Sequence, residues 1–72
     1  MSEEILAMLS NLGALNVERA ASIELISKSE RLRGVDVAAE IAIFEEKGYV
    51  KKFGEKIYLT EAGLIRALSM IS

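Results

Sequence analysis

A chain of 72 residues makes one domain, placed over residues 1–72, and a domain this short buries only about 60% of the surface that its unfolded chain exposes. Hydrophobic residues make up 51% of the chain, a larger share than one small core can use, so we expect a partner surface and, most simply, a homodimer. The sequence has no cysteine or histidine, which excludes disulfides, the usual zinc ligands and histidine-dependent catalysis. We therefore expect no enzyme, no metal and no cofactor.

The first predicted element is a helix that ends at Gly13. Ser2 can serve as its N-cap, the two glutamates at residues 3–4 suit the positive end of the helix dipole, and apolar residues recur at helical spacing behind them. Leu6 lies on a flank of this stripe, where it either contributes to a dimer contact or packs in the core under a long loop. The stripe itself consists of Ile5, Met8, Leu9 and Leu12.

The start of the chain and the length of its apolar runs predict where in the cell the protein is located. Residues 1–4 lack the positive charge and following apolar stretch of a secretion signal, and the apolar runs fall far short of the roughly 18 residues that span a membrane. We therefore expect a cytoplasmic protein that does not cross a membrane.

The second helix has two possible starting points. Asn16 can cap a long helix that begins at Val17, or the helix can begin at Ser22, whose side chain can also cap. We prefer Ser22, because Glu24 then falls in the first turn, and Ile23 and Ile26 can face the core.

A polar segment from Ser27 to Gly34 must end this helix, and it carries the first basic cluster. Three cations, Lys28, Arg31 and Arg33, stand there against Glu30, a net charge of +2. Two interpretations stay open for them. They form a solvated turn, or they contact nucleic-acid phosphates, which fixes the register of a duplex without reading its sequence.

A third helix follows, with an apolar stripe at Val37, Ile41 and Phe44 and an end at Gly48, which offers the left-handed conformation. Its charged residues are all acidic, so residues 35–46 carry a net charge of −4. The positions that point away from the stripe are Asp36, Ala38, Ala39, Glu40, Ala42 and Ile43.

A β-hairpin comes next. Residues 49–53 and 56–59 alternate large apolar and charged residues, and Gly54-Glu55 fits a two-residue loop with glycine first. Four lysines against Glu55 give residues 47–58 a net charge of +3. Thr60 then suits the N-cap of a last helix, with Glu61 in its first turn.

The segments IFEEKGYV (residues 43–50) and IYLTEAG (residues 57–63) resemble winged helix-turn-helix DNA-binding regulators of the multiple-antibiotic-resistance type. In that family, a recognition helix ending in a phrase like LEEKGYV leads into a wing that closes on YxLTEAG. The match covers about a third of the chain. The resemblance implies an α+β fold, a small winged helix with a three-helix core, a two-stranded β wing and a C-terminal helix. It also implies that part of residues 14–21 forms a short strand beside the wing.

The function implied by the resemblance is that of a small transcription regulator bound to double-stranded DNA. Lys28, Arg31 and Arg33 would contact the DNA backbone, and the third helix would lie in or near the major groove. The wing lysines would neutralise phosphates in a salt-dependent way. Edge-strand lysines that discourage aggregation are the other interpretation of these residues. The DNA-facing residues of helix and wing would be Ala38, Ala39, Ala42, Lys51, Lys52 and Lys56.

The composition of the third helix supports an alternative function. Its outer face has no basic side chain, and Asp36 and Glu40 repel phosphate. A face of Ala39, Ala42 and Ile43 equally suits docking on another protein or on a second copy, so the alternative is a winged-helix protein–protein interaction module.

The last helix has apolar residues on more than one face, and some must pack on the first helix. The rest predict the dimer surface, because terminal helices commonly pair in the family. Gly63 either lets this helix approach a neighbour closely or is simply tolerated near the helix start. The predicted dimer residues are Leu6, Leu64, Leu68, Met70 and Ile71.

Overall fold

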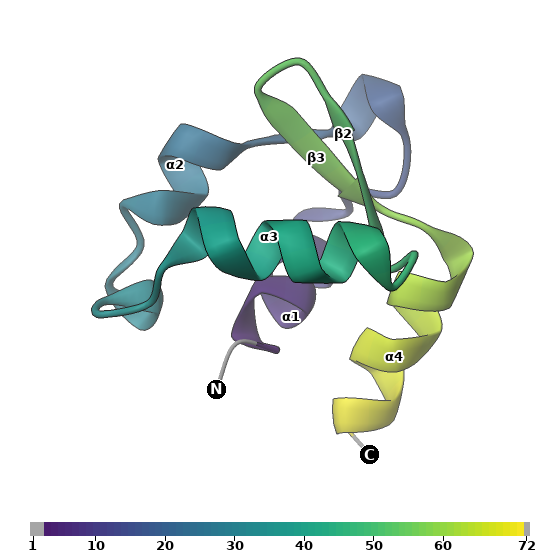
Figure 1. Cartoon of the computed structure of the whole chain (residues 1–72). Coiled ribbons are helices and arrows are strands. Elements are labelled where there is room, and N and C mark those ends of the chain that lie inside the picture. The colour runs from purple at the N-terminus through teal and green to yellow at the C-terminus, as the bar shows by residue number, and fades with distance from the viewer. Residues whose placement is uncertain (1–2, 72) are drawn as a thin grey trace.

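The computed structural model describes residues 3–71 and the side chains of residues 3–69, which form a small α+β fold. This part of the chain contains four α-helices, two short 3₁₀ helices and one three-stranded antiparallel sheet (Figure 1). In chain order the elements are α1 (Glu4–Leu12), η1 (Val17–Arg19), β1 (Ala21–Ser22), α2 (Ile23–Ser27), η2 (Glu30–Leu32), α3 (Val37–Glu46), β2 (Val50–Phe53), β3 (Lys56–Leu59) and α4 (Glu61–Ile71).

The hairpin β2–β3 has the predicted two-residue loop. Val50 lies opposite Leu59 and Phe53 opposite Lys56, which leaves a two-residue loop, and Gly54 has the positive φ of 64° that a glycine in its first position allows. The sheet is not limited to these two strands. β1 pairs with β3, in the strand order β1-β3-β2, so the short strand that the resemblance implied beside the wing is present at Ala21–Ser22 and the sheet has three strands.

The structure also resolves the ambiguous stretch before α2. A long helix from Val17 does not form, because η1 ends after three residues, although the Asn16 side chain does accept a hydrogen bond from the Arg19 N–H at 2.9 Å. The preferred start is confirmed, since Ser22 Oγ accepts a hydrogen bond from the Leu25 N–H at 3.3 Å and α2 begins at Ile23.

The core lies between α1, α3 and the sheet. The predicted stripe Val37, Ile41 and Phe44 is buried, as are Ile57 and Leu59 of β3 and other residues of α1. Leu6 has an exposed fraction of 0%, so its assignment to a dimer surface was wrong. The α1 helix is covered on two sides, by α4 and by the sheet, which leaves no free flank at this position.

A close contact fixes the start of α4 against the end of α3. Thr60 Oγ1 accepts a hydrogen bond from the Gly63 N–H at 3.0 Å and donates one to the Gly48 carbonyl, while the Thr60 N–H donates to the Tyr49 carbonyl at 3.0 Å. A Cβ at Gly63 would overlap the Tyr49 carbonyl oxygen. The prediction of a capping threonine is therefore confirmed, and Gly63 is there because of a close approach.

Candidate nucleic-acid interface

Three predicted site elements lie along one side of the molecule. Figure 1 shows α3 across the front, with the β2–β3 hairpin rising above it and the turn that contains η2 beyond its N-terminal end. The fold therefore places the hairpin and the first basic cluster next to α3, which is the predicted third helix. Within residues 3–71, no helix is long and apolar enough to cross a bilayer, and no cluster of side chains could hold a metal ion.

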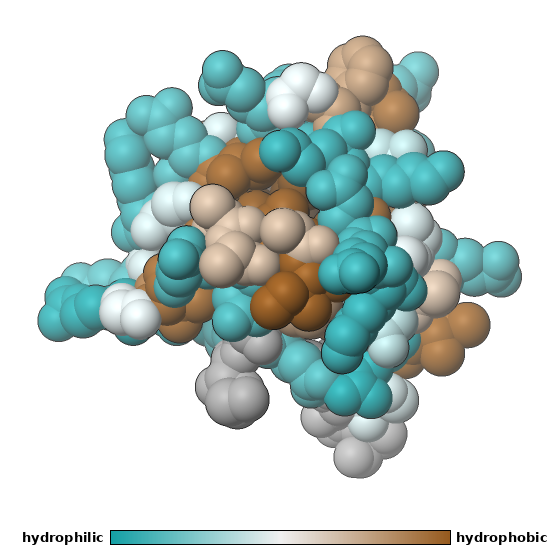
Figure 2. All heavy atoms as spheres, in the orientation of Figure 1, coloured by the Kyte–Doolittle hydropathy of each residue, from teal (hydrophilic) through white to brown (hydrophobic). Residues whose placement is uncertain are grey.

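The outer face of α3 is open and mainly apolar. Ala38, Ala39, Ala42 and Ile43 are exposed, and Figure 2 shows an apolar area over α3 surrounded by hydrophilic side chains. Asp36 is engaged at the helix start, because its carboxylate accepts a hydrogen bond from the Ala39 N–H at 3.2 Å. Its charge therefore stabilises the N-terminus of α3, a capping role that was missed in the sequence although Asp is a preferred N-cap residue.

The hairpin lysines Lys51, Lys52 and Lys56 are all exposed, and among the residues described none of them makes an ion pair. Their register divides them between the two faces of the hairpin. Lys51 and Lys56 share a face with Phe53, whereas Lys52 lies opposite Ile57 on the other face. The cations thus extend on both sides of a narrow ribbon rather than forming one flat patch.

The turn cations have a different environment, since each pairs with a carboxylate. Lys28 Nζ lies 3.6 Å from Glu24 Oε2, and Arg33 Nη2 lies 3.6 Å from Glu30 Oε2. In each pair the two residues are close together in the sequence. The first two pairs have the i,i+4 and i,i+3 spacings that a sequence can reveal. The third pair, Arg31 with Glu4, joins segments far apart in the chain and was missed.

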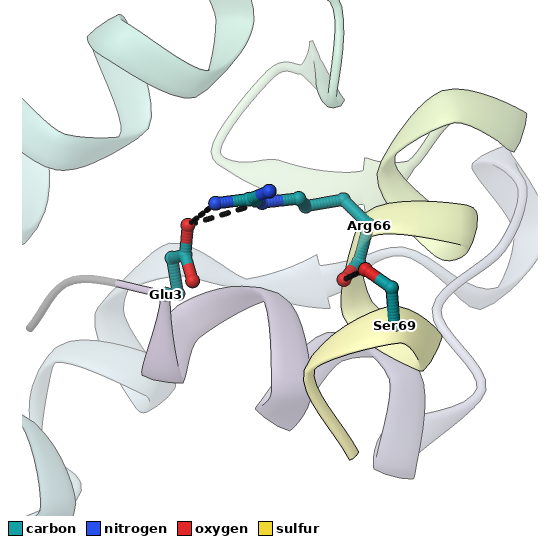
Figure 3. Close-up of polar contacts among 3 residues, drawn as sticks. All are labelled: Glu3, Arg66 and Ser69. Carbon is teal, nitrogen blue, oxygen red and sulfur yellow. Dashed lines mark hydrogen bonds and ion pairs between the residues drawn. The ribbon is translucent and has the colours of Figure 1, made fainter. Parts of the chain in front are cut away.

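A fourth ion pair ties α1 to α4 away from these elements. Arg66 donates two hydrogen bonds to Glu3, one of them from Nε at 3.0 Å, and Ser69 Oγ donates to the Arg66 carbonyl at 2.9 Å (Figure 3). The hydrogen bond with Glu3, and then its negative charge, raise the pKa of Arg66. Glu3 occupies the cap position of α1 but makes no capping hydrogen bond there, and the predicted N-cap, Ser2, lies outside the described residues.

The predicted dimer surface on α4 is only partly present among the described side chains. Leu68 is 52% exposed, but Leu64 is half-buried and packs on the core. Ile65 is 62% exposed and was missed, although it lies one helical turn before Leu68 on the same face. The side chains of Met70 and Ile71, which complete the prediction, lie outside those described.

Comparisons with protein-family models, with characterised proteins and with solved structures found no match. The function must therefore be argued from the geometry of these elements.

Proposed function

We propose that this protein is a small winged helix that binds double-stranded DNA as a transcription regulator, with the β2–β3 hairpin as its wing. One observation carries the proposal. The three hairpin lysines are exposed, have no carboxylate partner in the described part of the chain, and stand beside an open helix face. Four other cations, Lys28, Arg31, Arg33 and Arg66, are paired within the fold.

The two-sided placement of the lysines suits the DNA backbone. A hairpin that carries Lys51 and Lys56 on one face and Lys52 on the other can reach phosphates on both sides of a groove. Each neutralised phosphate releases counterions, so the binding depends on salt rather than on the base sequence.

The α3 face supports close approach but little base reading. Alanines at positions 38, 39 and 42 let a helix backbone come near a groove, and their methyl groups can contact thymine methyl groups. No side chain on this face can form the bidentate contacts that Arg makes with guanine or Asn with adenine. We therefore expect modest sequence selectivity, and we expect a homodimer to pair through the exposed face of Ile65 and Leu68 on α4.

A fluorescence anisotropy titration of a labelled duplex tests the proposal directly. Binding is expected at about 50 mM salt, and three phosphate contacts predict a roughly 40-fold loss of affinity when the salt is raised to about 200 mM. Absence of binding at the lower salt concentration would overturn the proposal.

Replacing Glu4 by glutamine tests whether the turn takes part. The change removes the carboxylate that holds Arg31, so Arg31 becomes available to a phosphate. We expect DNA affinity to rise about 2- to 5-fold, the range of a surface ion pair, and the salt slope to steepen by about 0.9.

Glu3→Gln is the matched control for this experiment. It makes the same charge change at the neighbouring residue, but its partner Arg66 lies on α4, away from the proposed DNA surface. An equal gain in both variants would assign the effect to net charge and exclude a phosphate contact by Arg31.

The apolar face of α3 favours a second candidate, a protein–protein interaction module. Ile43 is exposed among alanines on a helix whose charges are all acidic, and the apolar area of Figure 2 covers this region. Ile43→Glu is then expected to dissociate an assembly while leaving the monomer folded, as measured by light scattering and circular dichroism. An unchanged mass would count against this candidate.

A further inference from the structure

An apolar groove lies beside the proposed DNA surface and shares only Lys56 with it. It encloses about 630 Å³ between α1 and α2, with β1 and the end of η1 between these helices. The residues that line it are Met8, Leu12, Arg19, Ala20, Ala21, Ser22, Leu25, Ile26 and Lys56. Three of its lining residues, 20–22, are consecutive and small, which leaves room for the apolar side chains of a bound helix.

Two leucines on the groove walls are unusually exposed. Leu12 is 60% exposed and Leu25 is 70% exposed, although Leu12 ends the apolar stripe of the first predicted helix. Leu15 and Val17, in the adjoining segment, are also large exposed apolar residues. Because contiguous apolar surface of this kind marks interaction sites, the groove calls for an apolar partner.

The charge of the groove indicates what else the partner carries. Its charged lining residues are Arg19 and Lys56, and no carboxylate lines it. Neither cation makes an ion pair within the described residues, unlike Lys28 and the three paired arginines. A ligand that combines apolar anchors with negative charge would complement both features of the groove.

We propose that this groove binds an acidic amphipathic helix of another protein. Apolar residues at helical spacing would pack between Leu12 and Leu25, and flanking carboxylates would pair with Arg19 and Lys56. DNA supplies the charge but no apolar face for the leucines. A second copy placed groove to groove would bring like cations into one apolar contact, which disfavours a symmetric dimer here.

Two synthetic peptides of about 20 residues, long enough to form a helix, test the proposal. Both carry leucine at helical spacing, with glutamate at the other positions in one peptide and lysine in the second. Titration of the isotope-labelled full chain, followed by NMR, should show the acidic peptide binding at least about 10-fold tighter than the basic one. The shifted amides should be those of residues 19–26 and Lys56.

Leu25→Glu provides the variant and Ala62→Glu its control, because each change adds one negative charge. Both residues are exposed, so each change should leave the circular dichroism spectrum intact, but Ala62 lies on α4, outside the groove and outside the proposed dimer surface. The first change should weaken the acidic peptide at least about 10-fold and the second should leave its affinity unchanged.

The proposal is overturned if neither peptide binds, if both bind equally, or if the shifts fall outside the groove. It is also overturned if light scattering shows that the chain self-associates and that Leu25→Glu abolishes this association, because a second copy would then occupy the groove.

Discussion

Replacing Gly63 by alanine is expected to destabilise the protein by about 3 kcal/mol or more, although the same change in an ordinary helix stabilises by about 1 kcal/mol. The sign reverses because the new methyl group would overlap the Tyr49 carbonyl oxygen. That carbonyl is backbone and also accepts the hydrogen bond of the Thr60 N–H, so it cannot move without breaking the junction between α3, β2 and α4.

Thermal unfolding measures this effect. For a domain of this size, about 3 kcal/mol corresponds to a fall in Tm of at least about 12 °C. Ala62→Gly is the control, because Ala62 is exposed in the same helical turn and this change should cost only about 1 kcal/mol. An unchanged or raised Tm for Gly63→Ala would contradict the close packing of α4 on Tyr49.

Removing Lys51 and Lys52 together is expected to weaken DNA binding by on the order of 10- to 100-fold at low salt, about equally for every duplex sequence. The two side chains lie on opposite faces of β2 and have no carboxylate partner in the described residues, so both charges are available to phosphates. The dependence of affinity on salt should also flatten, with a slope reduced by about 1.8.

A charge-matched control is the double change of Lys28 and Arg33 to alanine. It also removes two positive charges, but each is already paired with a carboxylate at 3.6 Å. We expect this control to lose only several-fold in DNA affinity. If this control weakened binding as much as the lysine pair, the turn rather than the hairpin would be the main phosphate contact.

Local chemistry explains which elements were predicted from the sequence. Gly54 in the hairpin loop, Ser22 at the start of α2 and Thr60 at the start of α4 each act on their own few residues of chain. Such turn and capping signals depend on the nearest backbone groups alone, so periodicity and residue type were enough to place them.

The features that stayed open or were missed depend on residues distant in the chain. The short strand that the resemblance implied is β1, which exists as a strand only through its pairing with β3, and Leu6 is buried because α4 and the sheet close over α1. The Arg31–Glu4 ion pair likewise joins η2 to the start of α1. No local pattern encodes such contacts, so the open alternatives for residues 14–21 and for Leu6 needed the tertiary structure.

The exposure of the candidate site residues follows only in part from the sequence pattern. The net charge of residues 47–58 marked the hairpin as a cluster of cations, and all three lysines are exposed, although Lys52 lies on the face of the buried Ile57, opposite to Lys51 and Lys56. The sequence could not distinguish them from the turn cations, because pairing with a carboxylate depends on where the fold brings the acids. The groove was also missed, because its lining residues come from α1, β1, α2 and β3, which no single stretch of sequence brings together.

An NMR titration of the isotope-labelled chain with duplex DNA tests the central claim most directly, because it locates the bound surface residue by residue. The account predicts that the amides of Val50–Phe53 and Lys56–Leu59 shift most, followed by the exposed residues of α3, while Ile65 and Leu68 on α4 do not respond. Shifts confined to α4 or to the groove, with the hairpin unchanged, would contradict it.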